Sequence, residues 1–260
     1  DGINVWCAAG KGTFGTEELV RRIEASRLKE VVIRRDLIVP QLGAPGVAAH
    51  TVKKLSGFAV HYGPVRAEDL PSYLDAGLKA EPGMRIKGFP LKERAVLIPV
   101  ELVEALKPSL LIAPLLLLSG GIGGPAGFWQ NVLQDGLFAV LAFLSAVIGG
   151  TVLTPLLLPH LPGRAFSTKG LWLGAAVAIV VLSLRGGDLS PWAARLGILA
   201  WLLIIPAVTA YLAMNFTGCS TYTSHSGVTR EMRWALPLEA LMGGAGLLVW
   251  IASRLIGLGG

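Results

Sequence analysis

Cysteine and histidine are scarce in this chain of 260 residues, which contains two cysteines and four histidines. Cys7 and Cys219 lie far apart and the histidines show no ligand spacing, so a zinc site is hard to build. The sequence also lacks a cysteine cluster for an iron–sulfur centre, a Ser-His-Asp pattern and a P-loop. The commonest metal, hydrolase and nucleotide sites are therefore not indicated.

Charged residues are also few. They make up 15% of the chain, against 53% hydrophobic residues and a mean hydropathy of +0.61. This composition is too apolar for an ordinary soluble fold, so part of the chain is expected in a bilayer. The net charge is +6, but no lysine-rich run is interleaved with aromatic residues. We attribute the basic excess to the loops of a membrane protein in contact with lipid. No nucleic-acid partner is indicated.

The charges are distributed unevenly along the sequence. Residues 1–108 hold 16 of the 23 Lys and Arg and 13 of the 17 Asp and Glu. We therefore expect a polar domain over residues 1–108 and a transmembrane domain over residues 109–260. The chain begins at Asp1 without an initiator Met or an apolar leader, which we interpret as a fragment or a processed product.

The transmembrane domain is expected to be an all-α bundle of about five helices, since a helix needs roughly 20 apolar residues to cross a bilayer. A re-entrant loop is the alternative for the first span, which Pro114 and several glycines interrupt. If the polar domain is cytoplasmic, the basic residues of two loops fall on the inside, as the positive-inside rule requires. The spans are Ser109–Phe128, Gly136–Pro159, Gly170–Leu184, Trp192–Met214 and Ala235–Leu258.

Ionisable residues of the apolar part fall near the ends of these spans, at Asp135, Arg195, Glu239 and Arg254. A transporter or channel would place such groups at mid-membrane, so this pattern favours a scaffold. Small residues predict close helix packing within that scaffold. They are Ser145, Gly149, Gly243, Gly244 and Gly246.

The polar part alternates helix-like and strand-like segments, which predicts an α/β domain with a largely parallel sheet. Thr16 is expected to N-cap a helix with Leu19, Val20 and Ile23 on one face. "VVIR", "LIVP" and the segment through Val60 read as strands or strand ends. Helices are expected at 47–55 and 67–76. Ligands bind at the carboxyl ends of the strands in such sheets.

The stretch "NVWCAAGKGTFGT" admits several interpretations. Gly10, Gly12 and Gly15 match G-x-G-x-x-G, with Asp36 about twenty residues further on, but the motif needs a strand directly before it and a helix starting within it. Cys7 is either an inert buried thiol or, with Lys11 one turn on, a thiolate that serves as ligand or nucleophile. The lack of further ligands indicates that a metal at Cys7 would arrive within a cofactor.

"NVWCAAGK" resembles the cap-helix signature of the mercury-methylating corrinoid protein family, HgcA. "GTFGTEEL" is similar both to that family and to the large subunit of the corrinoid iron–sulfur protein of the acetyl-CoA pathway, which is soluble. "LPGRAFSTKG" and "NFTGCSTYTSHSGVTREMRWALPL" resemble segments of the HgcA membrane domain. The resemblance implies a Rossmann-like corrinoid-binding domain followed by transmembrane helices.

By this resemblance Cys7 is the axial ligand to the cobalt of a corrinoid such as cobalamin, and the D-x-H-x-x-G motif of many other corrinoid proteins is missing. The glycines would let the backbone approach the macrocycle, and two loops would hold the nucleotide tail or ring edge. The expected cofactor-binding residues are Asn4, Val5, Trp6, Cys7, Ala8, Ala9, Gly10, Lys11, Gly12, Thr13, Gly15, Gly43, Gly46, Tyr62, Gly63 and Pro64.

The resemblance implies a corrinoid-dependent methyltransferase that converts Hg(II) to methylmercury. Transfer to an electrophilic metal moves the methyl group with its electrons, formally as a carbanion, or as a radical, and a thiolate opposite the methyl group would favour this by donating electron density to cobalt. Cys219 is a candidate Hg(II) contact, with an incidental loop thiol as the alternative.

The family pairs with a ferredoxin-like HgcB-type electron donor carrying two 4Fe-4S clusters, and its methyl group is attributed to a methylated folate through another protein. The expected location is the inner (cytoplasmic) membrane, with several spans. Two other functions are open: a corrinoid methyl carrier serving another acceptor, and a non-enzymatic membrane protein with a nucleotide-binding sensor domain.

Overall fold

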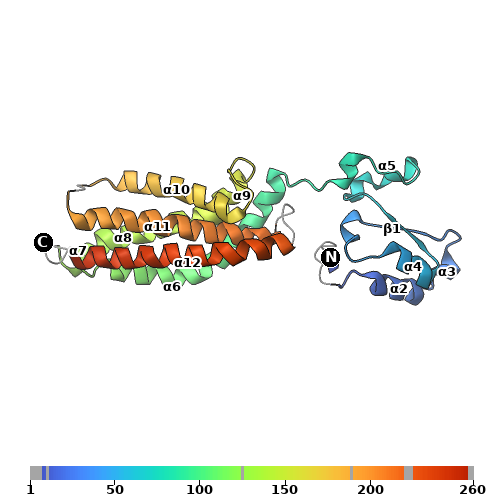
Figure 1. The fold of residues 1–260 in the computed structure, drawn as a ribbon, viewed down its shortest axis with the longest axis horizontal. Coiled ribbons are helices and arrows are strands. Elements are labelled where there is room, and N and C mark those ends of the chain that lie inside the picture. Colours follow the sequence, from blue (N-terminus) through green and yellow to red (C-terminus); the bar gives the residue numbers. More distant parts are fainter. Residues whose placement is uncertain (1–7, 10–11, 124–125, 188–189, 220–224, 257–260) are drawn as a thin grey trace. The chain divides into compact units, whose positions relative to one another are not determined.

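The computed structural model describes residues 8–9, 12–123, 126–187, 190–219 and 225–256 (Figure 1). The chain divides into two compact units, Asp1–Gly88 (unit 1) and Phe89–Gly260 (unit 2). The expected boundary at residue 108 falls inside a helix of unit 2 that begins at Leu91. The division lies earlier than the charge distribution suggested because this helix starts with a charged turn and becomes apolar only further along.

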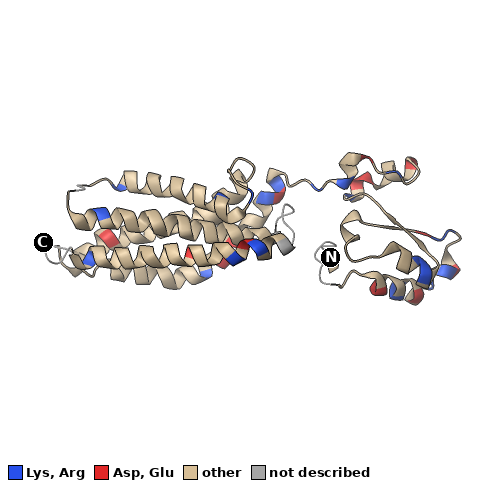
Figure 2. Cartoon of the chain, viewed as in Figure 1, with Lys and Arg blue, Asp and Glu red and all other residues tan. Residues whose placement is uncertain are grey.

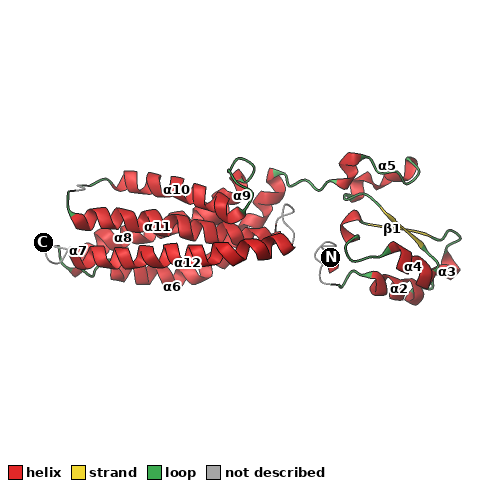
Figure 3. Ribbon diagram, viewed as in Figure 1, coloured by secondary structure: helices red, strands yellow, loops and turns green. Residues whose placement is uncertain are grey.

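Unit 1 contains a two-stranded parallel sheet with short helices (Figure 3). In the register, Asp36 lies opposite Ala59 and Val39 lies opposite Tyr62. The expected parallel α/β arrangement is confirmed for these two strands. The elements are α2 (Thr16–Ala25), α3 (Leu28–Val31), β1 (Asp36–Val39), η1 (Gln41–Gly43), α4 (Ala49–Ser56), β2 (Ala59–Tyr62), η2 (Ala67–Asp69), α5 (Leu70–Asp75) and η3 (Pro82–Arg85).

The core of unit 1 lies between the sheet and helices α2 and α4. Ile23, Val52 and Phe58 are buried there, and Leu19 and Val20 pack against them. The apolar face predicted for the helix after Thr16 is therefore confirmed. Because two short helices and one face of a two-stranded sheet supply these residues, the core is small.

Two local expectations for unit 1 are wrong. "VVIR" is not a strand: Val31 ends α3, and Ile33 is 99% exposed. Its β-branched residues favour a strand, but no described strand pairs with this segment, and only Val32 of its apolar residues packs against the core. Thr16 is not the N-cap of α2 either. That position is Gly15, and the Thr16 hydroxyl binds the loop after β1 instead.

Unit 2 is a helical bundle with five helices that are long and apolar enough to cross a membrane. The expected number of spans is confirmed. The second span, Phe128–Leu157, passes through two π-helical turns. The elements are α6 (Leu91–Ser119), α7 (Phe128–Asn131), η4 (Val132–Gly136), α8 (Leu137–Ile148), η5 (Gly149–Leu153), α9 (Thr154–Leu157), α10 (Phe166–Arg185), α11 (Trp192–Asn215), η6 (Phe216–Cys219) and α12 (His225–Ile256).

The bounds expected for the first span are wrong. The helix runs from Leu91 to Ser119 and continues through Pro99, Pro108 and Pro114. Proline removes a backbone donor but does not end a helix when neighbouring helices support it, as membrane bundles do. The helix instead ends at the glycines that follow, since α6 has its C-cap at Gly120.

Small residues bring the helices of unit 2 together. A Cβ on Gly174 would lie 2.5 Å from the Cα of Pro206, and one on Gly246 would lie 3.0 Å from the Ala200 carbonyl oxygen. Gly149 faces Thr209 at 3.4 Å by the same measure. The packing role predicted for Gly149 and Gly246 is confirmed, whereas Gly244 has open space around it.

Charged residues lie toward the two ends of α10 and near the start of α11, and α8 carries none (Figure 2). One end of the bundle contains the buried cluster Phe89, Leu158, Phe166 and Phe216. At the opposite end, Arg185 and Arg254 pair with Asp135. Many large apolar side chains on the outside of the helices are exposed, as expected of a surface facing lipid.

Candidate functional site

The residues expected to form the site divide into a described part and a part that is not described. Asn4, Val5, Trp6, Cys7, Gly10 and Lys11 lie outside the described residues. Ala8 and Ala9 are helical, and the chain turns directly after them. The Phe14 amide donates to the Ala8 carbonyl at 3.0 Å, and the Thr13 hydroxyl donates to the same oxygen at 3.2 Å. The segment that follows Cys7 in the sequence therefore ends in a closed turn.

The loop after β1 supports this turn through backbone contact. A Cβ on Gly46 would clash with the Phe14 carbonyl oxygen and lie 3.1 Å from the Cα of Ala9. A Cβ on Gly15 would lie 3.3 Å from the Gly12 oxygen and 3.5 Å from the Gly46 oxygen. Glycine at 46 thus allows the 8–16 segment to rest directly on the loop. The contact partner of these two glycines is the protein's own backbone.

Thr16 fixes the same contact by hydrogen bonds. Its amide donates to the Gly46 carbonyl at 3.0 Å, and its hydroxyl accepts from the Ala48 amide at 2.9 Å. On the other side of the loop, the Tyr62 hydroxyl donates to the Val47 carbonyl at 2.6 Å. The segment 8–16, the loop 43–48 and the end of β2 are therefore one connected platform.

A pocket of about 400 Å³ lies at the carboxyl ends of the two parallel strands. Pro40 and Leu42 from the first strand's loop line it, together with Gly63 and Pro64 after β2. Gly63 is buried, and a Cβ there would lie 2.7 Å from Cγ2 of Ile38. This is the place where open parallel sheets bind ligands, as the sequence predicted.

The loop with Gly43 and Gly46 and the loop with Gly63 and Pro64 were both expected to hold the nucleotide tail or ring edge of the cofactor. In the structure they differ in their contacts. Gly63 and Pro64 belong to the described pocket lining, while Gly43 and Gly46 do not, and Gly46 makes the contact with segment 8–16. Arg66 also lines the pocket, and its side chain is exposed. Sequence reasoning did not predict this residue as part of the site. Its position directly after a strand end was the available signal. A guanidinium there suits a carboxylate, amide or phosphate of a ligand.

The ion pair of unit 1 closest to the sheet joins Asp36 to His61. The His61 ring lies 3.0 Å from the Asp36 carboxylate, and Arg34 lies 3.5 Å from it. The hydrogen bond from His61, followed by the charge of Arg34, holds the pKa of Asp36 below its ordinary value. His61 thus links β1 to β2, which agrees with an ordinary structural histidine.

The described residues that lie near the strand ends fit part of a corrinoid site. The pocket is concave and mostly apolar, with one guanidinium at its edge, and the platform next to it carries the segment that follows Cys7. Within the described residues, no group of three or more His, Cys, Asp and Glu side chains gathers to hold a metal ion by itself.

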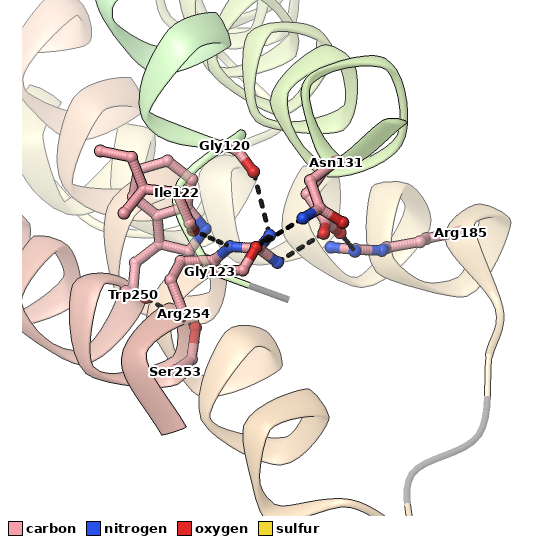
Figure 4. Close-up of polar contacts among 9 residues, drawn as sticks. Gly120, Ile122, Gly123, Asn131, Arg185, Trp250, Ser253 and Arg254 are labelled. Atoms are coloured by element: carbon pink, nitrogen blue, oxygen red, sulfur yellow. Dashed lines mark hydrogen bonds and ion pairs between the residues drawn. The ribbon is translucent and has the colours of Figure 1, made fainter. Parts of the chain in front are cut away.

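The second polar cluster closes the far end of the helical bundle (Figure 4). Arg254 donates to the carbonyls of Gly120 at 2.9 Å, Gly123 at 2.8 Å and Ile122 at 3.1 Å, and it pairs with Asp135. Asp135 also pairs with Arg185. Because Arg254 binds both a carboxylate and the loop carbonyls, this cluster ties the end of α12 to the turn after α6.

Cys219 lies at the end of η6, between the fourth and fifth spans, and its side chain is not described. Phe216, at the start of η6, belongs to the buried cluster that contains Phe89. The loop of Cys219 therefore lies at the end of the bundle where α6 begins.

Comparison with known proteins found no matching family model, no matching curated protein and no matching solved structure.

Proposed function

We propose that this chain is a membrane-anchored, corrinoid-dependent methyltransferase that converts Hg(II) to methylmercury. The observation that carries the proposal is the segment "NVWCAAGK", whose described end, Ala8–Ala9, rests by glycine contact on the loop after β1. The resemblance to the HgcA family attaches the function to that segment. The five apolar helices supply the membrane anchor.

In this proposal unit 1 belongs to a Rossmann-like corrinoid-binding domain. A bound corrinoid would supply a cobalt-bound methyl group for transfer to the metal. The Cys7 thiolate would be the axial ligand to cobalt, and the hydrogen bonds of Thr13 and Thr16 would hold the segment that presents it. Gly63, Pro64 and Arg66 would contact the cofactor edge or its nucleotide tail.

The proposed partners are those that the resemblance to the HgcA family implies. The chain has two cysteines, too few for an iron–sulfur cluster, so electrons would come from a separate HgcB-type ferredoxin-like protein. The methyl group would come from a methylated folate through another protein. We place the chain in the inner (cytoplasmic) membrane with unit 1 in the cytoplasm, and Cys219 is proposed as a contact for incoming Hg(II).

The first experiment compares absorption spectra of the full chain reconstituted with cobalamin. We expect the wild type to give a base-off spectrum with thiolate ligation, and Cys7→Ala to lose it. Cys219→Ala is the matched control because it removes the other thiol and should leave the spectrum unchanged. Identical spectra for wild type and Cys7→Ala, or no cobalamin uptake by the wild type, would overturn the proposal.

A second experiment separates mercury from another methyl acceptor. Anaerobic cells expressing the chain with its electron donor are given Hg(II), and methylmercury is measured. Cys7→Ala should abolish the product, whereas full methylation by that variant would refute the proposed ligand. A wild type that binds cobalamin through Cys7 but yields no methylmercury would identify a methyl carrier for another acceptor.

A further inference from the structure

Unit 2 contains a cavity of about 440 Å³ between four of its spans. Pro108 and Ser109 of α6, Phe143 of α8 and Tyr211 of α11 line it, and α12 contributes Glu239 and Gly243. The volume lies within the range of small-molecule sites. Its lining is mostly apolar, so the cavity suits a lipophilic ligand that enters from the membrane.

Glu239 is the one charged residue among the described residues that line this cavity. Its side chain is 6% exposed, and both carboxylate oxygens are buried without a hydrogen-bond partner in the described part of the chain. The sequence places Glu239 near the start of the fifth span, and the structure adds that its side chain is buried. It lies well inside α12, which runs from His225 to Ile256.

Nearby polar groups do not satisfy this carboxylate. The Ser109 hydroxyl donates to the Ala105 carbonyl of its own helix at 2.7 Å. Glu231 lies two turns before Glu239 on α12, roughly 12 Å along the helix axis, and accepts a hydrogen bond from the Ser167 amide at 2.7 Å. The arrangement therefore favours a cationic partner.

Two other charged residues inside unit 2, Arg94 and Arg254, have hydrogen-bond partners. Arg94 donates to two backbone carbonyls, and Arg254 binds three carbonyls and Asp135. Glu239 alone among these three has no partner in the described residues. An unpaired buried carboxylate costs several kcal/mol, a cost that a cationic ligand removes. Ionisable residues inside membrane helices mark ligand or ion sites for this reason.

We propose that the cavity binds a lipophilic amine, with the alkyl chain against Phe143 and Pro108 and the ammonium group on the Glu239 carboxylate. The site is independent of the proposed methyl transfer, since it uses none of the residues of unit 1. Ligands of this chemistry include free alkyl amines and lysolipids with an ethanolamine headgroup. In both, a primary ammonium group would meet the carboxylate.

The test measures retention of radiolabelled dodecylamine by the full chain in phosphatidylcholine nanodiscs, corrected for empty nanodiscs. We expect saturable binding by the wild type and affinity weakened about tenfold or more by Glu239→Gln, which keeps the side-chain shape and removes the charge. Dodecanol is the matched neutral ligand, and its retention should not change between these two proteins. Equal dodecylamine affinity in wild type and Glu239→Gln would overturn the proposal.

A second variant tests the cavity itself. Gly243→Leu adds a side chain at a lining position whose Cβ would meet only Ala207, at 3.8 Å. It should abolish saturable dodecylamine binding while Glu239 is intact, and unchanged binding would contradict the proposed location. Unlabelled dodecylamine and lysophosphatidylethanolamine are then compared as competitors, and the stronger one identifies the source of the amine. Competition by neither would refute the amine site.

Discussion

At the scale of single residues, Arg94 shows how a buried charge can stabilise a membrane bundle. Its guanidinium donates to the carbonyls of Pro155 at 2.7 Å and Leu156 at 2.8 Å, at the end of α9. The helical partner of the Pro155 carbonyl would be the amide of residue 159, which is a proline and has no N–H. Arg94 therefore satisfies carbonyls that the backbone cannot satisfy.

We expect Arg94→Met to destabilise the protein by about 2 kcal/mol, because two buried carbonyls lose charge-assisted hydrogen bonds. Arg164→Met is the matched control, since Arg164 is exposed in the loop before α10. Thermal unfolding of the detergent-solubilised chain measures both. A Tm for Arg94→Met equal to that of Arg164→Met would show that Arg94 does not support α9.

Asp36 gives a prediction of pH dependence. His61 and Arg34 hold the pKa of its carboxyl below the ordinary value of 3.8. A group with a lower pKa in the folded state stabilises the fold above its unfolded pKa, and this contribution is lost as the pH falls through the folded pKa. Hydrogen exchange of β1 and β2 should therefore be slower in wild type than in Asp36→Asn at about pH 5, with the difference vanishing toward about pH 2.

The exposed Asp75→Asn is the control for that comparison. It should match wild type in the exchange of β1 and β2 at both ends of the pH range. A difference between wild type and Asp36→Asn that stays constant with pH would show that the Asp36 charge does not contribute.

Residue patterns predicted some single-residue roles and missed others for a physical reason. Ile23 was assigned to the core correctly, because helical spacing alone fixes which face is apolar. The burial of Glu239 was missed, because it depends on which neighbouring helices cover that part of α12. Arg66 was missed, because its proximity to Pro40 depends on the pairing of two strands.

At the scale of elements, the contact between segment 8–16 and the loop after β1 is the feature most sensitive to mutation. Gly46→Val should displace this segment, because the new side chain would meet the backbone at Phe14 and Ala9, which cannot move cheaply. We expect a loss of about 1–3 kcal/mol, typical of overpacking. Hydrogen exchange of the full chain should show faster exchange at the Phe14 and Thr16 amides.

Gly83→Ala is the matched control for the Gly46 variant. Gly83 lies in η3 and has open space where a Cβ would be added. Hydrogen exchange at residues 12–16 of Gly83→Ala should equal that of the wild type. Protected Phe14 and Thr16 amides in Gly46→Val would show that the segment does not rest on Gly46. If the proposed function holds, Gly46→Val also weakens cobalamin binding.

The sequence predicted helices and strands well where a long apolar pattern determines the element. It predicted them poorly where contacts with neighbouring segments determine whether the element forms or where it begins. Hydropathy alone identified five spans, because lipid requires long apolar helices. It placed the first span too late, since Pro108 and Pro114 resemble helix breakers although α6 continues through them. "VVIR" has strand-forming residues, yet strand formation needs a partner that residues 31–34 do not have in the described chain.

At the scale of the whole molecule, the bundle places its loops at two opposite ends. Arg94 contacts the end of α9, so the loop 158–165 lies where α6 begins. Arg254 contacts Gly120 and Gly123, so the turn after α6 lies where α12 ends. The first end carries Arg164, Lys169, Arg230 and Arg233, while the second carries Arg185, Arg195 and Arg254. By the positive-inside rule we expect the first end, with the start of α6, to face the cytoplasm.

This assignment predicts the labelling of single cysteines introduced at Arg164 and at Ala126, which is exposed in the turn before α7. Both are placed in a Cys7→Ala, Cys219→Ala background, and sealed cells are treated with a membrane-impermeant maleimide. Ala126→Cys should react in intact cells, whereas Arg164→Cys should react only after permeabilisation. The reverse pattern would overturn the orientation. Equal labelling of both positions in intact cells would contradict the spans themselves, because one span, Phe128–Leu157, lies between the two loops and places them at opposite ends of the bundle.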